Sequence, residues 1–441
     1  MNWKVVLSLM VLVVVFPSTL LAFEVGNFHI NGFVSQGYLD SSQNNFLAED
    51  SEEGSTQFRE VGLTAQSQLT DKLRLGVQLL SRDLGDVGND QIRLDWAFAD
   101  YRFNDKIGVR LGKVKLPFGL YNEGRDTDML RPMVFLPQSI YDETKRDLLV
   151  AYMGGGLYGN LSLGALGDLD YHGFYGTINF PDDALLNDAL TNNATFTLRT
   201  NIGPSLVPVA PGSTPQQKQG FVMTNLYAQN LEIDNEYIAG GAAVLNTAVE
   251  GLRFGLSYLR VKNDLDFKTA ISIDPADYSD PALYLAGSSL SGTLTNKSTW
   301  IGSVEYILGN LVLAAEYAET DREQTFAGYT GQDATSQSYY LMASYTFMEK
   351  FTLSLLYDVF YSDKDDKDGE DFAATSPARQ DFFSWRKDFG VGLRYDVNAN
   401  WTLKAEYHDV NGTGLFMTVI NDPADLEEDW DYVAFKVSYN F

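Results

Sequence analysis

Apolar and polar residues alternate along much of this sequence, and this period of two is the feature that most limits its fold. The segment 72–82 carries apolar residues at odd positions and mostly polar ones between them; the apolar set is Leu73, Leu75, Val77 and Leu79. The segment 60–69 follows the same pattern, and only Thr70 and Asp71 separate the two. Alternation over about ten residues indicates strands with one apolar face, joined here by a tight turn.

The same rhythm of short and long gaps continues along the chain. Further tight turns are expected near 104–105, 164–167, 249–251, 309–310, 348–349 and 398–400. Longer polar segments, expected to be loops, alternate with them near 40–54, 83–90, 117–150, 179–234, 263–297, 321–336, 362–385 and 411–429. This arrangement predicts about sixteen strands, with short periplasmic turns and long extracellular loops. Blurred alternation in 146–178, and a segment 221–231 that fits either a strand or a loop, leave about fourteen or eighteen strands open.

Residues 1–22 have the pattern of a secretory signal peptide. Lys4 gives a positive start, the stretch from Val5 to Phe16 is almost wholly apolar, and Ala22 offers a small residue for cleavage. The apolar run is shorter than the roughly 20 residues that a spanning helix needs, which favours a cleaved signal over an uncleaved anchor. We therefore expect an exported chain whose folded part is 23–441.

The chain ends in an amphipathic strand, with one apolar face formed by Val433, Phe435, Val437, Tyr439 and Phe441. An open strand edge finds no hydrogen-bonding partner in lipid, so a sheet that spans a membrane must close on itself. The expected fold class is therefore all-β: a closed antiparallel transmembrane β-barrel. The terminal Phe441 resembles the assembly signal of bacterial outer-membrane barrels, which implies that location and recognition by the barrel-assembly machinery.

The charge of the chain excludes some partners. The formal net charge of −27 argues against binding nucleic acid or an anionic surface. Much of the acid lies in predicted loops, at 49–53, 363–371 and 422–431. Three interpretations stay open: these acids keep long loops soluble, they hold divalent ions among lipopolysaccharide phosphates, or they attract cations to the mouth of a pore. The chain has no cysteine, so no disulfide supports the exported protein.

The loop 117–150, between the fifth and sixth predicted strands, is the candidate for function. Pro117 ends the strand because it cannot donate to the strand ladder, and Gly119 lets the chain turn inward. A loop of some thirty residues in a compact barrel needs a functional reason. It carries both basic and acidic residues, and a short helix is expected around 141–151.

The run from Leu116 to Glu123, LPFGLYNE, resembles a segment of Gram-negative porins, including relatives of the phosphate-selective porins. The resemblance covers about fifteen residues as a sharp motif and the rest as architecture. It implies a homotrimer whose loop folds into the lumen as a constriction, formed here by Pro117, Phe118, Gly119, Glu123, Arg125, Asp126, Asp128 and Arg131. Anion-specific members carry long basic ladders, whereas this chain has scattered bases.

The alternation also predicts a basic wall opposite this loop. By their position in the strands, seven bases are expected to point into the lumen: Lys72, Arg74, Arg93, Arg110, Arg394, Lys404 and Lys436. An acidic loop facing a basic wall sets up a transverse field that selects ions and orients dipolar solutes. The alternative is that these bases are simply solvated.

Evidence for catalysis or metal binding is weak. The histidines His29, His172 and His408 are dispersed, and 363–371 fails as a calcium loop because Lys364 and Thr375 occupy positions that need acids. We therefore expect no metal, no cofactor and no enzyme, but a channel for passive diffusion of small hydrophilic solutes and ions. Two rivals stay open: a substrate-selective, anion-binding channel, and an outer-membrane barrel enzyme or adhesin.

Overall fold

The computed structural model describes residues 23–25, 27–48, 50–181, 185–202, 205–208, 221–224, 226–271, 288–416 and 420–441. Within these ranges, one antiparallel sheet of seventeen strands closes into a barrel. Its shortest strand, β1 (Phe23–Val25), folds back on the start of β2, and the other 16 strands form the wall. The prediction of a closed barrel of about sixteen strands is confirmed. The predicted signal peptide, 1–22, lies outside the described residues.

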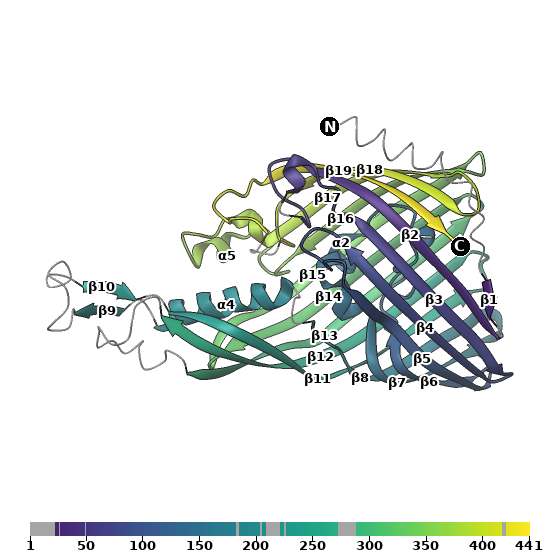
Figure 1. Ribbon diagram of the computed structural model, residues 1–441, viewed down its shortest axis with the longest axis horizontal. Coiled ribbons are helices and arrows are strands. Elements are labelled where there is room, and N and C mark those ends of the chain that lie inside the picture. The colour runs from purple at the N-terminus through teal and green to yellow at the C-terminus, as the bar shows by residue number, and fades with distance from the viewer. Residues whose placement is uncertain are drawn as a thin grey trace.

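The wall strands follow one another around the barrel in chain order (Figure 1). They are β2 (Phe28–Ser41), β3 (Arg59–Thr70), β4 (Leu73–Asp83), β5 (Ile92–Asn104), β6 (Ile107–Lys115), β7 (Ala151–Ser162), β8 (Gly167–Thr177), β11 (Leu226–Thr247), β12 (Leu252–Ile271), β13 (Ser289–Leu308), β14 (Leu311–Phe326), β15 (Tyr329–Phe347), β16 (Phe351–Tyr361), β17 (Trp385–Asp396), β18 (Trp401–Asn411) and β19 (Asp429–Asn440).

Two pairings that are distant in sequence complete the ring. β19 pairs with β2, and β8 pairs with β11 across the long segment between them. The last residue takes part in closure: the Phe441 amide donates to the Gly32 carbonyl at 3.0 Å, and the Gly32 amide returns a bond of 2.9 Å. The terminal aromatic residue is thus fixed on the strand that begins the wall.

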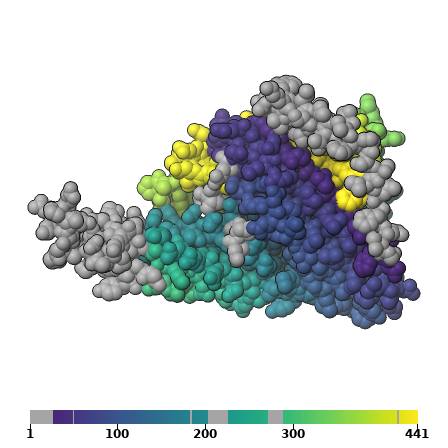
Figure 2. Space-filling model, viewed as in Figure 1, coloured from purple at the N-terminus to yellow at the C-terminus, as the bar shows by residue number. Residues whose placement is uncertain are grey.

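The two faces of the wall differ as the alternation predicts. On β14 and β15, the outward Leu313, Tyr317 and Leu341 are exposed, Leu341 at 60%. The inward Glu316 and Tyr340 of the same strands are buried. The strands therefore present an apolar outer surface. In Figure 2 the early part of the wall, coloured purple to blue, covers much of the side that faces the viewer. No helix in the described ranges is long and apolar enough to cross a membrane.

All seven predicted tight turns lie between consecutive strands at one end of the barrel. At the other end, the predicted loops at 263–297 and 321–336 were wrong in part. β12 continues to Ile271 and β13 starts at Ser289, while β14 and β15 are joined directly by Ala327 and Gly328, both with positive φ. These polar residues stay in strands because the antiparallel pairing of β12 to β15 continues through them. Residues 272–287 lie outside the described part.

A helix supports this extension. α4 (Leu185–Ile202) buries Leu190, Ala194 and Leu198 against Phe267 and Phe326 on the inner face of the extended strands (Figure 1). Within the segment 221–231, the described residues 221–224 and 226–231 are strand. They form β10 (Phe221–Thr224), which pairs with β9 (Ser205–Pro208), and the start of β11. The short helix α5 (Glu370–Ala374) and the 3-10 turns η1 (Ser51–Glu53), η4 (Gly164–Leu166) and η7 (Asp381–Ser384) lie in other connections.

Candidate functional site

The connection 116–150, which we call the inward loop, folds into the barrel between β6 and β7. It contains η2 (Asp128–Leu130), α2 (Gln138–Tyr141), η3 (Glu143–Lys145) and α3 (Arg146–Leu149), so the expected short helix near 141–151 is present as single turns. Asn122 closes the neck, because its side-chain amide donates to the carbonyls of Leu116 at 3.0 Å and Leu149 at 2.7 Å. The loop thus leaves and rejoins the wall at one point.

Gly119 makes the turn that sends the loop across the interior. Its φ is +62°, and a Cβ there would meet the Tyr141 hydroxyl at 2.3 Å and Glu316 at 2.9 Å. The Gly119 amide donates to Ser257 Oγ on β12 at 3.1 Å. Only glycine combines this backbone conformation with this close approach. The neighbours Pro117 and Phe118 are buried against the wall.

Glu316 on β14 anchors the loop to the far wall. This carboxylate, 3% exposed, accepts the Leu120 amide at 2.8 Å and the hydroxyl of Tyr141. The wall itself adds the Tyr340 hydroxyl at 2.9 Å and Ser303 Oγ at 2.5 Å. A buried carboxylate that accepts several hydrogen bonds is well compensated, so Glu316 fixes two segments of the loop at once.

Further acids of the wall hold the middle of the loop through its backbone. On β16, Asp358 accepts the Ser139 amide at 3.0 Å and the Ser139 hydroxyl. On β18, Glu406 accepts the Val134 amide at 2.8 Å. These bonds satisfy backbone donors that would otherwise be buried without partners.

Asp128 and its neighbours in the loop contact three adjacent strands. Arg394, Lys404 and Lys436 lie opposite one another on β17, β18 and β19. Like charges opposite each other in a sheet repel, so this row needs an acid. Asp128, fully buried, lies 3.1 Å from Lys404 Nζ and 3.2 Å from Lys436 Nζ, and also pairs with Arg131 at 3.0 Å.

The other bases and acids of this row complete the pairing. Lys436 pairs with Glu60 on β3, and Arg131 reaches the same carboxylate at 3.3 Å. Arg394 donates to the Met129 carbonyl at 2.5 Å and pairs with Asp396 at 2.8 Å. We call Asp128, Glu60 and the four bases Arg131, Arg394, Lys404 and Lys436 the loop latch.

The charges around Asp128 also control its protonation. Burial alone would raise the pKa of this carboxyl, but Lys404, Lys436 and Arg131 outweigh burial and hold the pKa well below its usual value. In Glu143, burial likewise raises the pKa, and Arg125 and Arg82 lower it further than burial raises it. Both carboxylates are therefore ionised at neutral pH.

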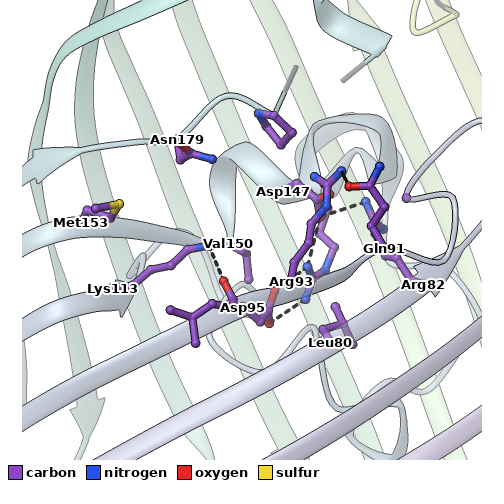
Figure 3. A pocket seen from close by; sticks show the side chains of 14 residues that line it. Leu80, Arg82, Gln91, Arg93, Asp95, Lys113, Asp147, Val150, Met153 and Asn179 are labelled. Atoms are coloured by element: carbon purple, nitrogen blue, oxygen red, sulfur yellow. Dashed lines mark hydrogen bonds and ion pairs between the residues drawn. The ribbon is translucent and has the colours of Figure 1, made fainter. Parts of the chain in front are cut away.

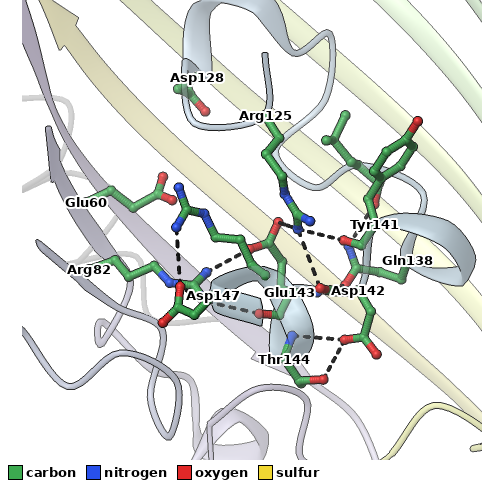
Figure 4. Close-up of polar contacts among 12 residues, drawn as sticks. Glu60, Arg82, Arg125, Asp128, Gln138, Tyr141, Asp142, Glu143, Thr144 and Asp147 are labelled. Atoms are coloured by element: carbon green, nitrogen blue, oxygen red, sulfur yellow. Dashed lines mark hydrogen bonds and ion pairs between the residues drawn. The ribbon is translucent and has the colours of Figure 1, made fainter. Parts of the chain in front are cut away.

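A second network of buried charges lies at the end of the loop (Figure 4). Glu143 pairs with Arg125 of the loop at 3.1 Å and with Arg82 of β4 at 2.9 Å. Arg146 makes a two-pronged pair with Asp95 of β5, at 2.7 and 2.9 Å. Asp126 pairs with Lys115 at 2.6 Å and accepts the indole N–H of Trp96 at 3.2 Å.

The structure divides the predicted constriction and wall residues into separate groups. Four of the constriction residues are buried in ion pairs: Arg125, Asp126, Asp128 and Arg131. Glu123, in contrast, is 55% exposed, and its carboxylate comes no nearer than 3.9 Å to the Arg110 guanidinium. Arg74 and Arg110 share Asp100, at 3.1 and 3.4 Å, nearer the tight-turn end. Lys72 lies in the turn before β4 rather than on the strand. The seven bases therefore do not form one continuous arc.

Arg93 lies apart from the other predicted wall bases, near the end of the barrel that carries the long loops. Pairing of β5 with β6 stops at Ala97 and Lys113, and beyond that point a cavity of about 550 Å³ opens at this edge of the wall (Figure 3). Arg93, Asp95, Lys113 and Asp147 line it, and Arg93 pairs with Asp147 at 3.1 Å.

An apolar cluster inside the barrel was not expected from the sequence. Phe118, Met133, Leu136 and Ile140 of the loop pack against inward residues of the wall, which include Leu259, Val261, Ile301, Ala318, Met342 and Leu356. Apolar residues on both faces of β12–β16 weaken the alternation there, and this blurring was the available signal. Glu316 was missed because a single acid in a strand has no distinguishing pattern.

His408 is bound inside the barrel and does not pair with its sequence neighbour Asp409. Its ring bonds Asp388 at 2.7 Å and stacks on Tyr432, while Asp409 faces the other side of β18 and is exposed. Within the described ranges, no three histidine or acidic residues are grouped to hold a metal ion.

A closed 16-stranded barrel with a long loop bonded across its interior has the fold of an outer-membrane porin. More particularly, residues 34–131 match the family described as phosphate-selective porin O and P. The chain thus resembles this family over its first strands and the start of the inward loop.

Solved structures of outer-membrane proteins are similar to this chain over nearly its whole length. The outer-membrane OmpT of Vibrio cholerae has 11% identity and a TM-score of 0.51, covering 96% of this chain and 100% of that one. An in-vitro folded form of the same protein has 11% identity and a TM-score of 0.50, covering 95% of this chain and 99% of that one. An anion-selective porin from Comamonas acidovorans has 11% identity and a TM-score of 0.49, covering 94% of this chain and 99% of that one. At a sequence identity of 11%, these similarities show a shared fold and nothing further. No curated protein sequence matches the chain significantly.

Replacing Asp128 by Asn should release the inward loop. The change leaves Lys404 and Lys436 buried without this counter-charge, and breaking a buried pair typically costs about 3–5 kcal/mol. Urea unfolding of the folded barrel in detergent measures the loss. Glu123→Gln is the matched control, because its carboxylate is exposed and should change stability by less than about 0.5 kcal/mol. Equal stability of Asp128→Asn and the parent would contradict the latch.

Acid should weaken the latch, and only below about pH 4. A carboxyl whose pKa is lower in the folded state adds stability above its unfolded pKa, about 3.9 for Asp, and loses it as pH falls toward the folded value. The difference in unfolding midpoint between the parent and Asp128→Asn should therefore stay constant from pH 8 to about 5 and shrink below about 4. A difference that grows on acidification would show that Asp128 is not held ionised by its neighbours.

Proposed function

We propose that this protein is a non-enzymatic porin of the bacterial outer membrane. It forms a water-filled channel for passive diffusion of small hydrophilic solutes and ions, and it needs no cofactor. The observation that carries the proposal is the inward loop, bonded to β3, β4, β5, β12, β14, β16, β17, β18 and β19 around the interior. A barrel of this strand number leaves a wide lumen, and a loop held across it sets the size of what passes.

The constriction is proposed to lie where the inward loop faces Arg74 and Arg110. Pro117, Phe118 and Gly119 direct the loop inward, and Arg125, Asp126, Asp128 and Arg131 hold it there through buried pairs. Three bases of the predicted basic wall, Arg93, Lys404 and Lys436, pair with acids of the loop. Arg394 pairs with Asp396 of the wall, whereas Arg74 keeps 40% of its side chain exposed. Ion preference is therefore set by a few residues around Asp100, which argues against a ladder for inorganic anions.

Planar-bilayer recording with a salt gradient tests the channel and its charge preference together. The folded protein should give discrete conductance steps, and replacing both Arg74 and Arg110 by Glu should move the reversal potential toward cation preference. The control reverses two exposed bases in turns, Lys106→Glu and Lys350→Glu, and should leave the reversal potential unchanged. A folded barrel that never conducts would refute the channel. Conductance with an unaltered reversal potential in the Arg74 and Arg110 variant would refute only their role.

We further propose a homotrimer in contact with lipid and lipopolysaccharide, assembled through recognition of Phe441 by the barrel-assembly machinery. The outward surface of β12–β16 supports association, because Leu252, Leu313, Ala315, Leu341 and Leu355 line an apolar hollow of about 520 Å³ there. Detergent extracts run unheated on a gel should show a species of three chains that dissociates on boiling. A single-chain species in unheated extracts, cross-linked or not, would contradict the trimer.

A further inference from the structure

We propose that the space between the inward loop and helix α4 is a binding site for a small carboxylate with an apolar body. The assignment rests on the proposed channel function, because it names the class of solute that the channel selects. A cavity of about 160 Å³ lies here, at the long-loop end of the barrel. The loop contributes Phe118, Ile140 and Leu149 to its lining, and the wall contributes Leu259 and Val261.

One arginine of the wall, Arg322 on β14, lines this cavity and has no ion-pair partner for its charge among the described residues. The other arginines described inside the barrel are paired, for example Arg82 with Glu143 and Arg386 with Asp388. The side chain of Arg322 makes no hydrogen bond and no ion pair with any residue in the described part of the chain. A guanidinium that is partly buried without a close acid is costly unless a ligand or water completes it.

The acid that lines the same cavity is already engaged. Asp142 acts electrostatically on Arg322, but its oxygens accept Lys145 Nζ at 2.7 Å and the Thr144 amide at 2.9 Å. Asp142, Lys145 and Arg322 are the charged residues of the lining. Because the first two neutralise each other, the cavity keeps one positive charge, on Arg322.

The rest of the lining separates into an apolar side and a polar side. The apolar side is formed by the loop and by β12, as named above. The polar side is uncharged and surrounds Arg322 with amides and hydroxyls: Asn263, Asn296, Thr299, Thr320, Gln324 and Ser336. A ligand that fits both sides has one anionic group and one hydrocarbon surface.

The chemistry of the two sides selects a carboxylate over other anions. A guanidinium offers two parallel N–H donors that match the two oxygens of a carboxylate. The apolar side favours a ligand with a ring or a branched chain, because burial of that hydrocarbon part removes apolar surface from water. A cavity of about 150 Å³ is enough to hold benzene, so an acid with about one ring fits this one. Inorganic phosphate would leave the apolar side uncovered.

Calorimetric titration of the folded barrel in detergent tests the site with three probes. Benzoate should bind, while benzyl alcohol, which has the ring without the charge, and inorganic phosphate, which has the charge without the ring, should bind at least about tenfold more weakly. Equal binding of benzyl alcohol would refute the role of Arg322. Phosphate binding as tight as that of benzoate would refute the role of the apolar side. No benzoate binding would overturn the site.

Variants then assign the binding to these residues. Arg322→Gln should weaken benzoate binding at least about tenfold, and Arg322→Lys less, because Lys keeps the charge without the two-pronged geometry. Arg379→Gln removes the same charge from another residue at this end of the barrel and should leave binding unchanged. Ile140→Asn should weaken benzoate binding several-fold with Arg322 intact.

Unchanged benzoate binding in Arg322→Gln would overturn the proposal, and if that variant fails to fold, the three probes on the parent protein still decide. The proposed channel and the proposed binding site can be refuted independently of each other. A conducting barrel that does not bind benzoate overturns only the site, and a barrel that binds benzoate without conducting overturns only the channel.

Discussion

Three bases stand side by side on β17, β18 and β19, and the position of the inward loop depends on their need for a counter-charge. Arg394, Lys404 and Lys436 would repel one another in an interior that excludes most water. Asp128 comes from the loop and lies between Lys404 and Lys436, with Glu60 of β3 on the other side of Lys436. Because removing either sign leaves the other buried and unpaired, the loop and the wall hold each other in place.

The fixed loop divides the interior into two unlike halves. Toward β3–β5 and β17–β19 its contacts include the buried ion pairs of Asp128 and Glu143. On the same side, Val134 and Phe135 pack in an apolar cluster with Tyr432. Toward β12–β16 many of its contacts are apolar, and its polar bonds go to Ser257 on β12, Glu316 on β14 and Asp358 on β16. The proposed recognition of a solute by Arg322 lies on the apolar half, and the proposed control of ion preference lies on the polar half, near Arg74 and Arg110.

The sequence predicted the barrel well because lipid imposes a simple rule on every strand: Leu73, Leu75 and Val77 face one way and their neighbours the other. It also predicted the loop 117–150 from Pro117 and Gly119. It did not predict that Lys404 and Lys436 would be buried, since alternation gives the direction of a side chain and not what the loop brings to it. Arg322 was overlooked for a different reason: its segment, 321–336, was predicted to be a loop, whereas β14 and β15 continue through it.

The central claim is that the inward loop is a fixed part of the wall at neutral pH. Hydrogen exchange of the folded barrel tests it most directly, at the amides of Leu120, Val134 and Ser139. These amides donate to Glu316, Glu406 and Asp358, so we predict that they exchange as slowly as strand amides of β14 and β16. Exchange as fast as that of exposed turn residues such as Lys106 would contradict the account, because it would mean that the loop moves freely inside the barrel.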